Sequence, residues 1–327
     1  MNRFAYLSPE SLDSAIHDLT SLEDVSLLAG GTALNPLLKC GVKKPSCILN
    51  LGRIQELKKL TLGENGLSLG SMVTLAELIE NPMVRQHLPA LAESARWVAS
   101  PQIRNQGTVG GNLLQEKRCH YFNQSASWRE NISPCFQLGG GVCHQVPSSK
   151  VCRAIYYSDL APVLLAFDAA TEILDEKGPK IISLEELIHN HVAGVKGTLI
   201  LKGISVPHPP PGTWGKFLKA SVRSAIDFAL ADVAIRYSPA GPREENPLVR
   251  IVIAALSPEP FCLEETAREL SRPRNASPRE KIIELALREA ASRSTPIRET
   301  AVSAKTKRQS LEILRRAMQE LLSVLPS

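Results

Sequence analysis

Two pairs of adjacent glycines constrain this chain more than any other feature of its sequence. Gly30-Gly31 follows the short apolar run Val25–Leu28, which is typical of a buried strand, and precedes Leu34–Lys39, which is typical of a helix. Gly110-Gly111 lies in a second glycine-rich loop at residues 106–112. Because glycine lacks a Cβ atom, the backbone at these points can turn tightly or approach another group closely.

Each glycine pair has two interpretations. One is a tight turn that needs positive φ, and the other is a nest of amide groups that binds an anion where a helix begins. Two such loops, each with a threonine beside it, favour the second interpretation and predict one diphosphate held from two sides. Neither loop has the G-x-G-x-x-G or Walker A pattern, so a bound nucleotide is expected to be held in a non-Rossmann manner.

The spacing of apolar residues predicts further elements. Ser8 followed by Pro9 is typical of a helix start, since a hydroxyl caps the helix and proline suits its first position. Strands are expected at 47–49, 67–69 and 248–256, and helices at 75–80, 82–99, 225–235, 278–292 and 305–325. The proline cluster at 206–212 predicts a linker or a domain edge.

Charge and hydropathy exclude several classes of protein. The net charge is +5 and no basic run is interleaved with aromatic residues, so no nucleic-acid partner is expected. The first residues lack the apolar core of a signal peptide, and no stretch approaches the length of a membrane span. A cytoplasmic location is expected, and there clustered cysteines indicate metal binding more often than disulfides.

Four of the seven cysteines lie in one stretch that is typical of neither helix nor strand: Cys119, Cys135, Cys143 and Cys152. The spacing contains no close pair of the kind found in zinc sites. Four thiolates on one loop suit an iron–sulfur cluster, although the spacing matches neither common ferredoxin pattern. Metal binding is therefore predicted, and an accidental grouping of thiols stays open as the alternative.

Other residues near this stretch have weaker interpretations. His120 and His144 are either competing ligands or solvated neighbours of the cysteines, and the second interpretation is favoured. The glycines at 139–141 are expected to let backbone amides approach a cluster closely. Cys40, Cys47 and Cys262 are expected to be small buried apolar residues.

Five motifs resemble, in the same order, those of a known family. They are Leu27-Leu28-Ala29-Gly30-Gly31-Thr32-Ala33-Leu34, Leu69-Gly70-Ser71-Met72-Val73-Thr74-Leu75-Ala76-Glu77-Leu78, Ile103-Arg104-Asn105-Gln106-Gly107-Thr108-Val109-Gly110-Gly111-Asn112-Leu113, Ser158-Asp159-Leu160-Ala161-Pro162 and Lys219-Ala220-Ser221-Val222-Arg223. The family is that of the FAD-binding medium subunits of xanthine dehydrogenase-type molybdenum enzymes. The resemblance covers nearly the whole chain.

The resemblance implies a fold and a domain organisation. An α+β, two-part FAD-binding domain of the PCMH type would cover residues 1–210, with subdomains at 1–60 and 61–210. A C-terminal domain of helices on a small antiparallel sheet would follow at 211–327. Most residues between Asn112 and Asp159 would be an insertion, at about 116–155, that carries the four clustered cysteines.

The resemblance also implies a set of FAD contacts. The two glycine loops would hold the pyrophosphate, Asp159 would lie beside the FAD, Lys219 near the isoalloxazine and Leu201 on the ring. Many members have Asp where this chain has Ala33, so only backbone contacts are expected there. The full implied set is Leu27, Leu28, Ala29, Gly30, Gly31, Thr32, Ala33, Leu34, Val98, Thr108, Gly110, Gly111, Asn112, Asp159, Leu201 and Lys219.

A cysteine-bearing insertion at this place is similar to that of the 4-hydroxybenzoyl-CoA reductase branch of the family. It implies one [4Fe-4S] cluster held by Cys119, Cys135, Cys143 and Cys152. Electrons would pass from ferredoxin through this cluster and FAD to the [2Fe-2S] clusters of a small subunit and the molybdenum cofactor of a large subunit. There 4-hydroxybenzoyl-CoA would lose its phenolic hydroxyl, in anaerobic degradation of aromatic compounds. The assembly would be an α2β2γ2 heterohexamer, and this chain would carry no catalytic residue.

Three alternatives stay open. The nearest is the flavin subunit of an oxidising enzyme, an aldehyde, xanthine or N-heterocycle dehydrogenase. The second is a flavin-free scaffold with structural zinc. The third is a cell-wall biosynthetic reductase, which shares the FAD fold, but the cysteine insertion and the C-terminal region count against it.

Overall fold

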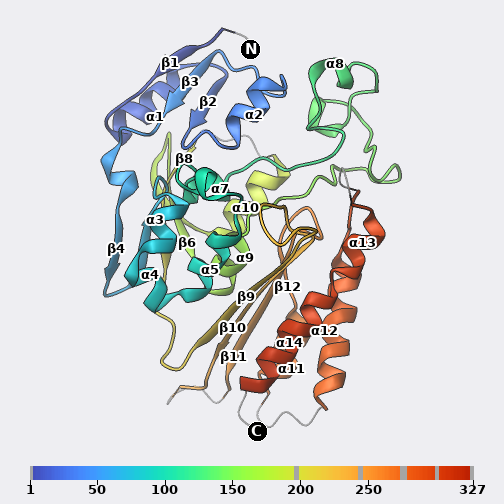
Figure 1. The fold of residues 1–327 in the computed structure, drawn as a ribbon. Helices are drawn as coiled ribbons and strands as arrows, with labels where there is room; N and C mark the ends of the chain where they lie inside the picture. The colour runs from blue at the N-terminus through green and yellow to red at the C-terminus, as the bar shows by residue number, and fades with distance from the viewer. Residues whose placement is uncertain (1–2, 195–198, 242–245, 273–277, 299–301, 325–327) are drawn as a thin grey trace.

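The structure, a computed structural model, describes residues 3–194, 199–241, 246–272, 278–298 and 302–324. Within these ranges the chain forms three separate sheets that are connected and covered by helices (Figure 1). The expected α+β fold class is therefore confirmed. Across the same ranges, no helix combines the length and the apolar character that crossing a bilayer requires.

The N-terminal part is a small parallel sheet with two helices. Its elements are β1 (Ala5–Leu7), α1 (Leu12–Ser21), β2 (Val25–Leu28), α2 (Leu34–Lys39) and β3 (Cys47–Asn50). β3 lies between β1 and β2, and both pairings are parallel. The Gly30-Gly31 loop therefore lies at the carboxyl edge of the sheet, where open α/β sheets commonly bind ligands.

The middle part is a five-stranded antiparallel sheet flanked by short helices. The strands are β4 (Leu60–Gly63), β5 (Gly66–Gly70), β6 (Ala170–Asp175), β7 (Gly178–Ser183) and β8 (Leu199–Val206), in the order β4-β5-β8-β6-β7. The helices are η1 (Gln55–Lys58), α3 (Leu75–Glu80), α4 (Pro82–His87), α5 (Pro89–Trp97), α6 (Pro101–Arg104), α7 (Val109–Leu113), α8 (Ala126–Arg129), η2 (Phe136–Leu138), α9 (Ala161–Ala166) and α10 (Leu184–Ala193). Its helices and sheet enclose the largest hydrophobic core.

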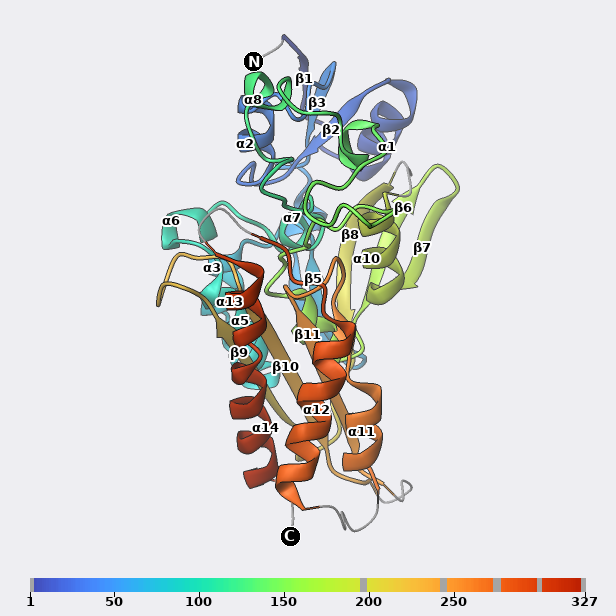
Figure 2. The same ribbon diagram turned by 90° about the vertical axis from the view of Figure 1, so that its right-hand side faces the viewer.

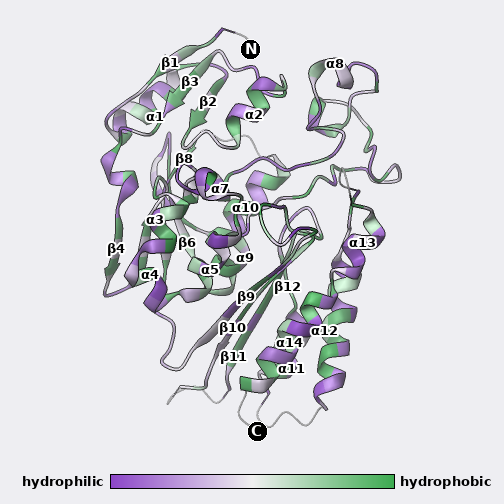
Figure 3. Ribbon diagram, in the orientation of Figure 1, coloured by the Kyte–Doolittle hydropathy of each residue, from purple (hydrophilic) through white to green (hydrophobic). Residues whose placement is uncertain are grey.

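The C-terminal part is a four-stranded antiparallel sheet, in the order β12-β11-β10-β9, with helices across one face (Figure 2). Its elements are β9 (Trp214–Ala220), β10 (Ala231–Ser238), β11 (Leu248–Ala254), β12 (Phe261–Cys262), α11 (Glu264–Leu270), α12 (Arg279–Arg293), α13 (Ala304–Gln309) and α14 (Glu312–Val324). Hydrophobic residues on α12 and α14 alternate with hydrophilic ones (Figure 3). The apolar residues of these helices form a second core with the sheet.

The two larger parts share their packing. Phe217, Ala234 and Val252 of the C-terminal sheet belong to the core of the middle part, on the face opposite the C-terminal helices. β10 consequently has helices on both sides and is buried at every position. A sheet held from both faces fixes the position of β9 relative to α5, and of β10 and β11 relative to α9 of the middle part.

The residues 225–235 are a strand and a preceding loop, and the expectation of a helix there is wrong. β10 begins at Ala231 and pairs with β9 and β11. A strand that is buried on both faces shows a continuous apolar run instead of alternation, and such a run is easily mistaken for a buried helix.

Three helix boundaries also differ from expectation. The first helix is capped by Ser11, whose side chain accepts from the Ser14 amide, and not by Ser8. The segment 82–99 is two helices, because Pro89 disfavours helical geometry at Leu88, which has φ −144°. The segment 305–325 is divided into α13 and α14, and its last expected residue, Leu325, lies outside the described residues.

Candidate functional site

The two glycine loops lie against each other. A Cβ atom added to Gly30 would stand 1.7 Å from the backbone oxygen of Gln106 in the second loop. A Cβ atom on Gly107 would stand 3.5 Å from the Thr32 side chain in the first loop. The structure therefore brings together the two loops that the sequence separates by about seventy residues. At Gly30 only glycine allows this approach.

The first loop presents unused amide groups. Within the described residues, the N–H groups of 30–33 meet no backbone or side-chain acceptor. Gly31 has φ +71°, a left-handed conformation that turns the chain into α2. Ala33 is the N-cap of α2 and offers no side-chain hydrogen bond, so the helix start also remains uncapped. Amides grouped in this way favour an anion.

Most backbone amides of the second loop already donate hydrogen bonds within the protein. The Gly110 amide donates to the Ser71 carbonyl (2.8 Å), and the Gly111 amide donates to Thr108 Oγ1 (3.0 Å). Among the amides of 106–112 in the described chain, only that of Thr108 has no acceptor. The two loops are thus not equivalent, and the expected nest is a property of the first loop. Gly110 itself is required because an added Cβ would stand 2.7 Å from Ser71.

Thr108→Val tests whether the Thr108 side chain, which caps α7, stabilises the second loop. The change keeps the side-chain size but removes the oxygen that caps α7, and we expect the free energy of unfolding to fall by about 1 kcal/mol. Urea denaturation measures it. Thr20→Val is the matched control, because the Thr20 hydroxyl only donates back to carbonyls within exposed α1. Equal losses in the two variants would contradict the capping role.

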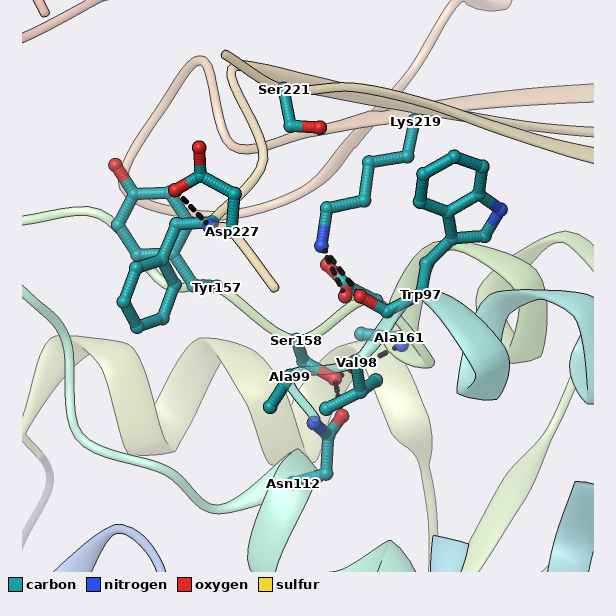
Figure 4. Close-up of polar contacts among 12 residues, drawn as sticks. Trp97, Val98, Ala99, Asn112, Tyr157, Ser158, Ala161, Lys219, Ser221 and Asp227 are labelled. Carbon is teal, nitrogen blue, oxygen red and sulfur yellow. Dashed lines mark hydrogen bonds and ion pairs between the residues drawn. The ribbon is translucent and has the colours of Figure 1, made fainter. Parts of the chain in front are cut away.

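Ser158 and Asp159, which are adjacent in the chain, join the second loop to Lys219 through two separate buried hydrogen bonds. The Ser158 hydroxyl donates to Asn112 Oδ1 (2.6 Å) and accepts from the Ala161 amide (3.1 Å). Asp159 Oδ2 lies 2.7 Å from Lys219 Nζ, and both side chains are almost fully buried. In Figure 4, Lys219 extends from the sheet toward Trp97, with Ser158 and Asn112 beyond it. This arrangement joins three of the expected site residues.

The segment at the end of α5 completes this region. Lys219 Nζ also donates to the Trp97 carbonyl (3.2 Å). The Arg104 guanidinium donates to the Val98 and Ala99 carbonyls, both at 2.9 Å. Ala99 has φ +43°, an unfavourable value for a residue with a Cβ atom. Arg104 therefore holds a strained turn, and with it Val98, beside the Lys219 amine.

The remaining expected contacts are dispersed. Leu27 and Leu28 end β2, and with Ala29 they lead into the first loop. Leu201 lies on β8, is 2% exposed and belongs to the largest core. Its contact with a flavin ring stays a prediction, as do the other assignments of single residues to FAD.

The cysteine segment leaves the rest of the fold and returns to it at the same place. An isolated antiparallel bridge joins Arg118 to Ile155, with reciprocal hydrogen bonds of 2.8 and 3.0 Å. Between these residues lie α8 and η2 in otherwise irregular chain, as expected. Arg129 of α8 donates to the Gly41 carbonyl (2.9 Å), which fixes the segment beside α2 (Figures 1 and 2). Gln145 exchanges hydrogen bonds with the backbone of Arg298 and so attaches the segment to the C-terminal part.

All four clustered cysteines line one cavity of about 20 Å³. The thiols are free, and Phe122, Phe136 and Val142 form part of the wall. Cys152 Sγ accepts from Gln137 Nε2 (3.2 Å) and from the Ala154 amide (3.4 Å). Burial raises the pKa of the Cys119 thiol, while the amides of residues 121 and 122 lower it. Convergent thiols with N–H donors and apolar walls fit the chemistry of an iron–sulfur cluster.

The spacing of these thiols is looser than that of a formed metal site. Within the described residues, no three His, Cys, Asp or Glu side chains are grouped closely enough to hold a metal ion. The cavity has room for little more than one water molecule, so the segment must rearrange around the thiols to enclose a cluster.

Neighbouring residues in the segment have other roles than expected. The glycines at 139–141 form a tight turn: Gly139 has φ +78°, and a Cβ on Gly140 would meet the Pro134 carbonyl at 1.7 Å. They do not line the cavity, so the expected approach of their amides to a cluster is not observed. His144 lines the cavity but its Nε2 is paired with the Ser133 carbonyl (2.8 Å).

Three residues position the site without being in the expected set. Arg104 and Ser158 lie inside the family motifs, so the motifs were the signal that could have identified them. Trp97 acts through its carbonyl group, which a side-chain pattern cannot reveal.

Known proteins share this fold. A family model described as the FAD binding domain in molybdopterin dehydrogenase matches residues 2–209. The chain is 29% identical over 285 residues to the aldehyde oxidoreductase FAD-binding subunit of Escherichia coli (strain K12), covering 83% of this chain and 87% of that subunit. It is 28% identical over 250 residues to the nicotine 6-hydroxylase medium subunit of Paenarthrobacter nicotinovorans, covering 76% of this chain and 73% of that subunit. A carbon monoxide dehydrogenase structure from Hydrogenophaga pseudoflava superposes with a TM-score of 0.75 at 23% identity, covering 97% of this chain and 96% of that one, and shows the shared fold.

Proposed function

The chain belongs to the family of FAD-binding subunits of molybdopterin dehydrogenases, and from this premise we propose that it is the flavin and iron–sulfur subunit of a 4-hydroxybenzoyl-CoA reductase. In this proposal it transfers electrons and performs no substrate chemistry. Residues 1–210 form the FAD-binding domain, with subdomains at 1–60 and 61–210, and residues 211–327 form the C-terminal domain. The segment at about 116–155 carries the cluster.

Three features of the glycine loops support FAD binding. The first loop offers unused amides at a helix start, which suit a diphosphate. The second loop closes against it at Gly30. Asp159 and Lys219, which are expected beside the FAD and its ring, form a buried ion pair. When bound, FAD supplies the ability to accept and release electrons singly or in pairs, while these residues bind and orient it.

The cysteine cavity is the observation that carries the proposal of a reductase. Cys119, Cys135, Cys143 and Cys152 converge on one cavity in the same chain as the flavin loops. We assign them one [4Fe-4S] cluster. A second redox centre beside the flavin suits electron entry from a strongly reducing donor such as ferredoxin, and removal of a phenolic hydroxyl from an aromatic thioester needs such a donor.

The proposed partners follow from the electron path through the cluster and FAD. Electrons leaving FAD would pass to a small subunit with [2Fe-2S] clusters and then to a large subunit with the molybdenum cofactor. An α2β2γ2 assembly is proposed. The relatives are themselves named as subunits: one as an FAD-binding subunit and one as a medium subunit.

An oxidising enzyme is the second candidate function. The relatives named above include an aldehyde oxidoreductase and a hydroxylase, and their similarity to this chain fits that direction of electron flow equally well. In that case the cysteine cluster would pass electrons from FAD to an acceptor instead of receiving them from a donor.

The assay of the complete complex distinguishes the two functions. We expect the anaerobically purified heteromer, supplied with a reduced low-potential donor, to convert 4-hydroxybenzoyl-CoA to benzoyl-CoA. The same preparation is tested with aldehydes and N-heterocycles and an oxidised acceptor. Oxidation of one of these substrates without formation of benzoyl-CoA would contradict the reductase proposal and support the alternative.

A further inference from the structure

Asp232 is a buried carboxyl group beside the candidate flavin contact. It lies on β10, directly opposite Lys219 of β9 in the antiparallel pairing. It is 1% exposed, and neither carboxyl oxygen meets a hydrogen-bond donor among the described residues. An ionised carboxylate buried without donors is strongly disfavoured. Some feature of its surroundings must therefore compensate, or the group must be neutral.

Three charged groups face Asp232 from different elements. Lys219 is its cross-strand neighbour, Asp159 approaches from the turn before α9, and Lys307 from α13. The Lys219 amine is already 2.7 Å from the Asp159 carboxylate and also donates to the Trp97 carbonyl (Figure 4). The Lys307 amine donates to the Tyr157 hydroxyl (2.6 Å). Neither amine donates a hydrogen bond to Asp232.

A proton on Asp232 removes the cost of burying this carboxyl group without a hydrogen-bond donor. Burial raises the pKa of both carboxyls, and the Asp159 carboxylate raises the pKa of Asp232 further. Of the two groups, Asp159 keeps its charge because the Lys219 amine is paired with it. A protonated Asp232 can donate to Asp159, and its oxygens are then no longer without a partner. Two carboxyls close together commonly share one proton for this reason.

We propose that Asp232 carries a proton that it shares with Asp159, and that this proton sets the charge that the Asp159–Lys219 pair presents to the bound flavin. The inference rests on the proposed flavin site. With the proton, the three groups together are neutral, and without it they carry one negative charge. A negative charge beside a group that accepts electrons opposes its reduction. Asp232 is thus a positioning residue that acts through the pair.

Asp232→Asn tests the proposal, because the amide keeps the shape and a donor group but cannot ionise. The midpoint potential of the flavin in the holoprotein is measured from mildly acidic to alkaline pH. We expect the wild-type potential to fall more steeply on the alkaline side, with an inflection that the variant lacks. Below the pH of the inflection the two potentials should coincide, because both residues are then neutral.

Asp175→Asn is the matched control. It removes a carboxyl from the β6–β7 hairpin, where the partner Lys180 is largely exposed, and should keep the inflection. An inflection that persists in Asp232→Asn would overturn the proposal. The proposal would also be overturned if the flavin potential of Asp232→Asn were more positive than that of the wild type at neutral pH and the two plots of potential against pH were parallel. Asp232 would then be ionised in the wild type.

The FAD-free protein gives an independent measurement. A carboxyl whose pKa is higher in the folded than in the unfolded state stabilises the fold less as pH rises between the two values. The thermal midpoint of the wild type should therefore fall toward alkaline pH, and that of Asp232→Asn should fall less. Identical slopes would overturn the shared proton. If neither protein binds FAD while the slopes differ, the proposed function fails and the shared proton is supported.

Discussion

Protein in which Gly30 is replaced by alanine is expected to purify almost without FAD. The added Cβ would stand 1.7 Å from the Gln106 backbone oxygen, and no side-chain rotation can relieve a clash between backbone segments. The two glycine loops must then move apart, and the unused amides of the first loop lose their alignment. The ratio of FAD to protein after denaturation of the purified holoprotein measures the effect.

Two further variants make this result interpretable. Gly63→Ala is the control, because a Cβ there meets no atom within 4 Å and φ is not positive. Gly31→Val places a branched residue at φ +71° and should also give flavin-poor protein. Circular dichroism establishes whether each variant is folded. A folded Gly30→Ala protein with the FAD content of Gly63→Ala would show that the contact between the loops does not form the flavin site.

Cys143→Ser is expected to remove the iron of the proposed cluster while FAD stays bound. Cys143 lines the cavity with the other three cysteines, whereas the flavin loops lie outside the segment that the Arg118–Ile155 bridge closes. A serine hydroxyl is a poor replacement for a thiolate ligand of iron. Iron and acid-labile sulfide should fall by the content of one [4Fe-4S] cluster per copy of this chain, and the EPR signal of that reduced cluster should disappear while the signals of the [2Fe-2S] clusters remain.

Cys262→Ser is the control for this change. Cys262 lies on β12 and is not among the residues that line the cavity, so its replacement should leave the cluster in place. Both variants are purified anaerobically within the complete complex. Zinc in the wild type with only the iron and sulfide of the [2Fe-2S] clusters, or the wild-type iron content in Cys143→Ser, would contradict the proposed cluster.

The sequence predicted those parts of the fold in which a local signal is strong. β2, α2 and α3 have the predicted bounds, because the apolar run of β2 leads into the Gly30-Gly31 loop before α2 and because Thr74 caps the start of α3. The prediction of a helix at 225–235 failed because burial of β10 depends on helices that are distant in the sequence. The break at Leu88 was predictable in principle, since Pro89 restricts the residue before it.

The candidate site shows the same division. Motifs placed the glycine loops, Asp159 and Lys219 in one region before any geometry was available. They did not show that the second loop has used its amides, because the Val109 and Gly110 amides donate to Val73 and Ser71, which are distant in the sequence. Asp232 carries no local signal either. Its significance comes from cross-strand register and burial, which only the folded chain defines.

The hydrogen-bonded bridge between Arg118 and Ile155 has a consequence for how such a subunit can diversify. A stretch whose two ends already meet can be gained, lengthened or lost in one genetic event without rethreading the surrounding chain. The residues that attach it elsewhere, such as Arg129 on the carbonyls near α2, are a few surface contacts that can be acquired later. The cysteine segment is therefore a separable insertion, and under the proposed function the route by which electrons reach the flavin can change while the rest of the fold stays the same.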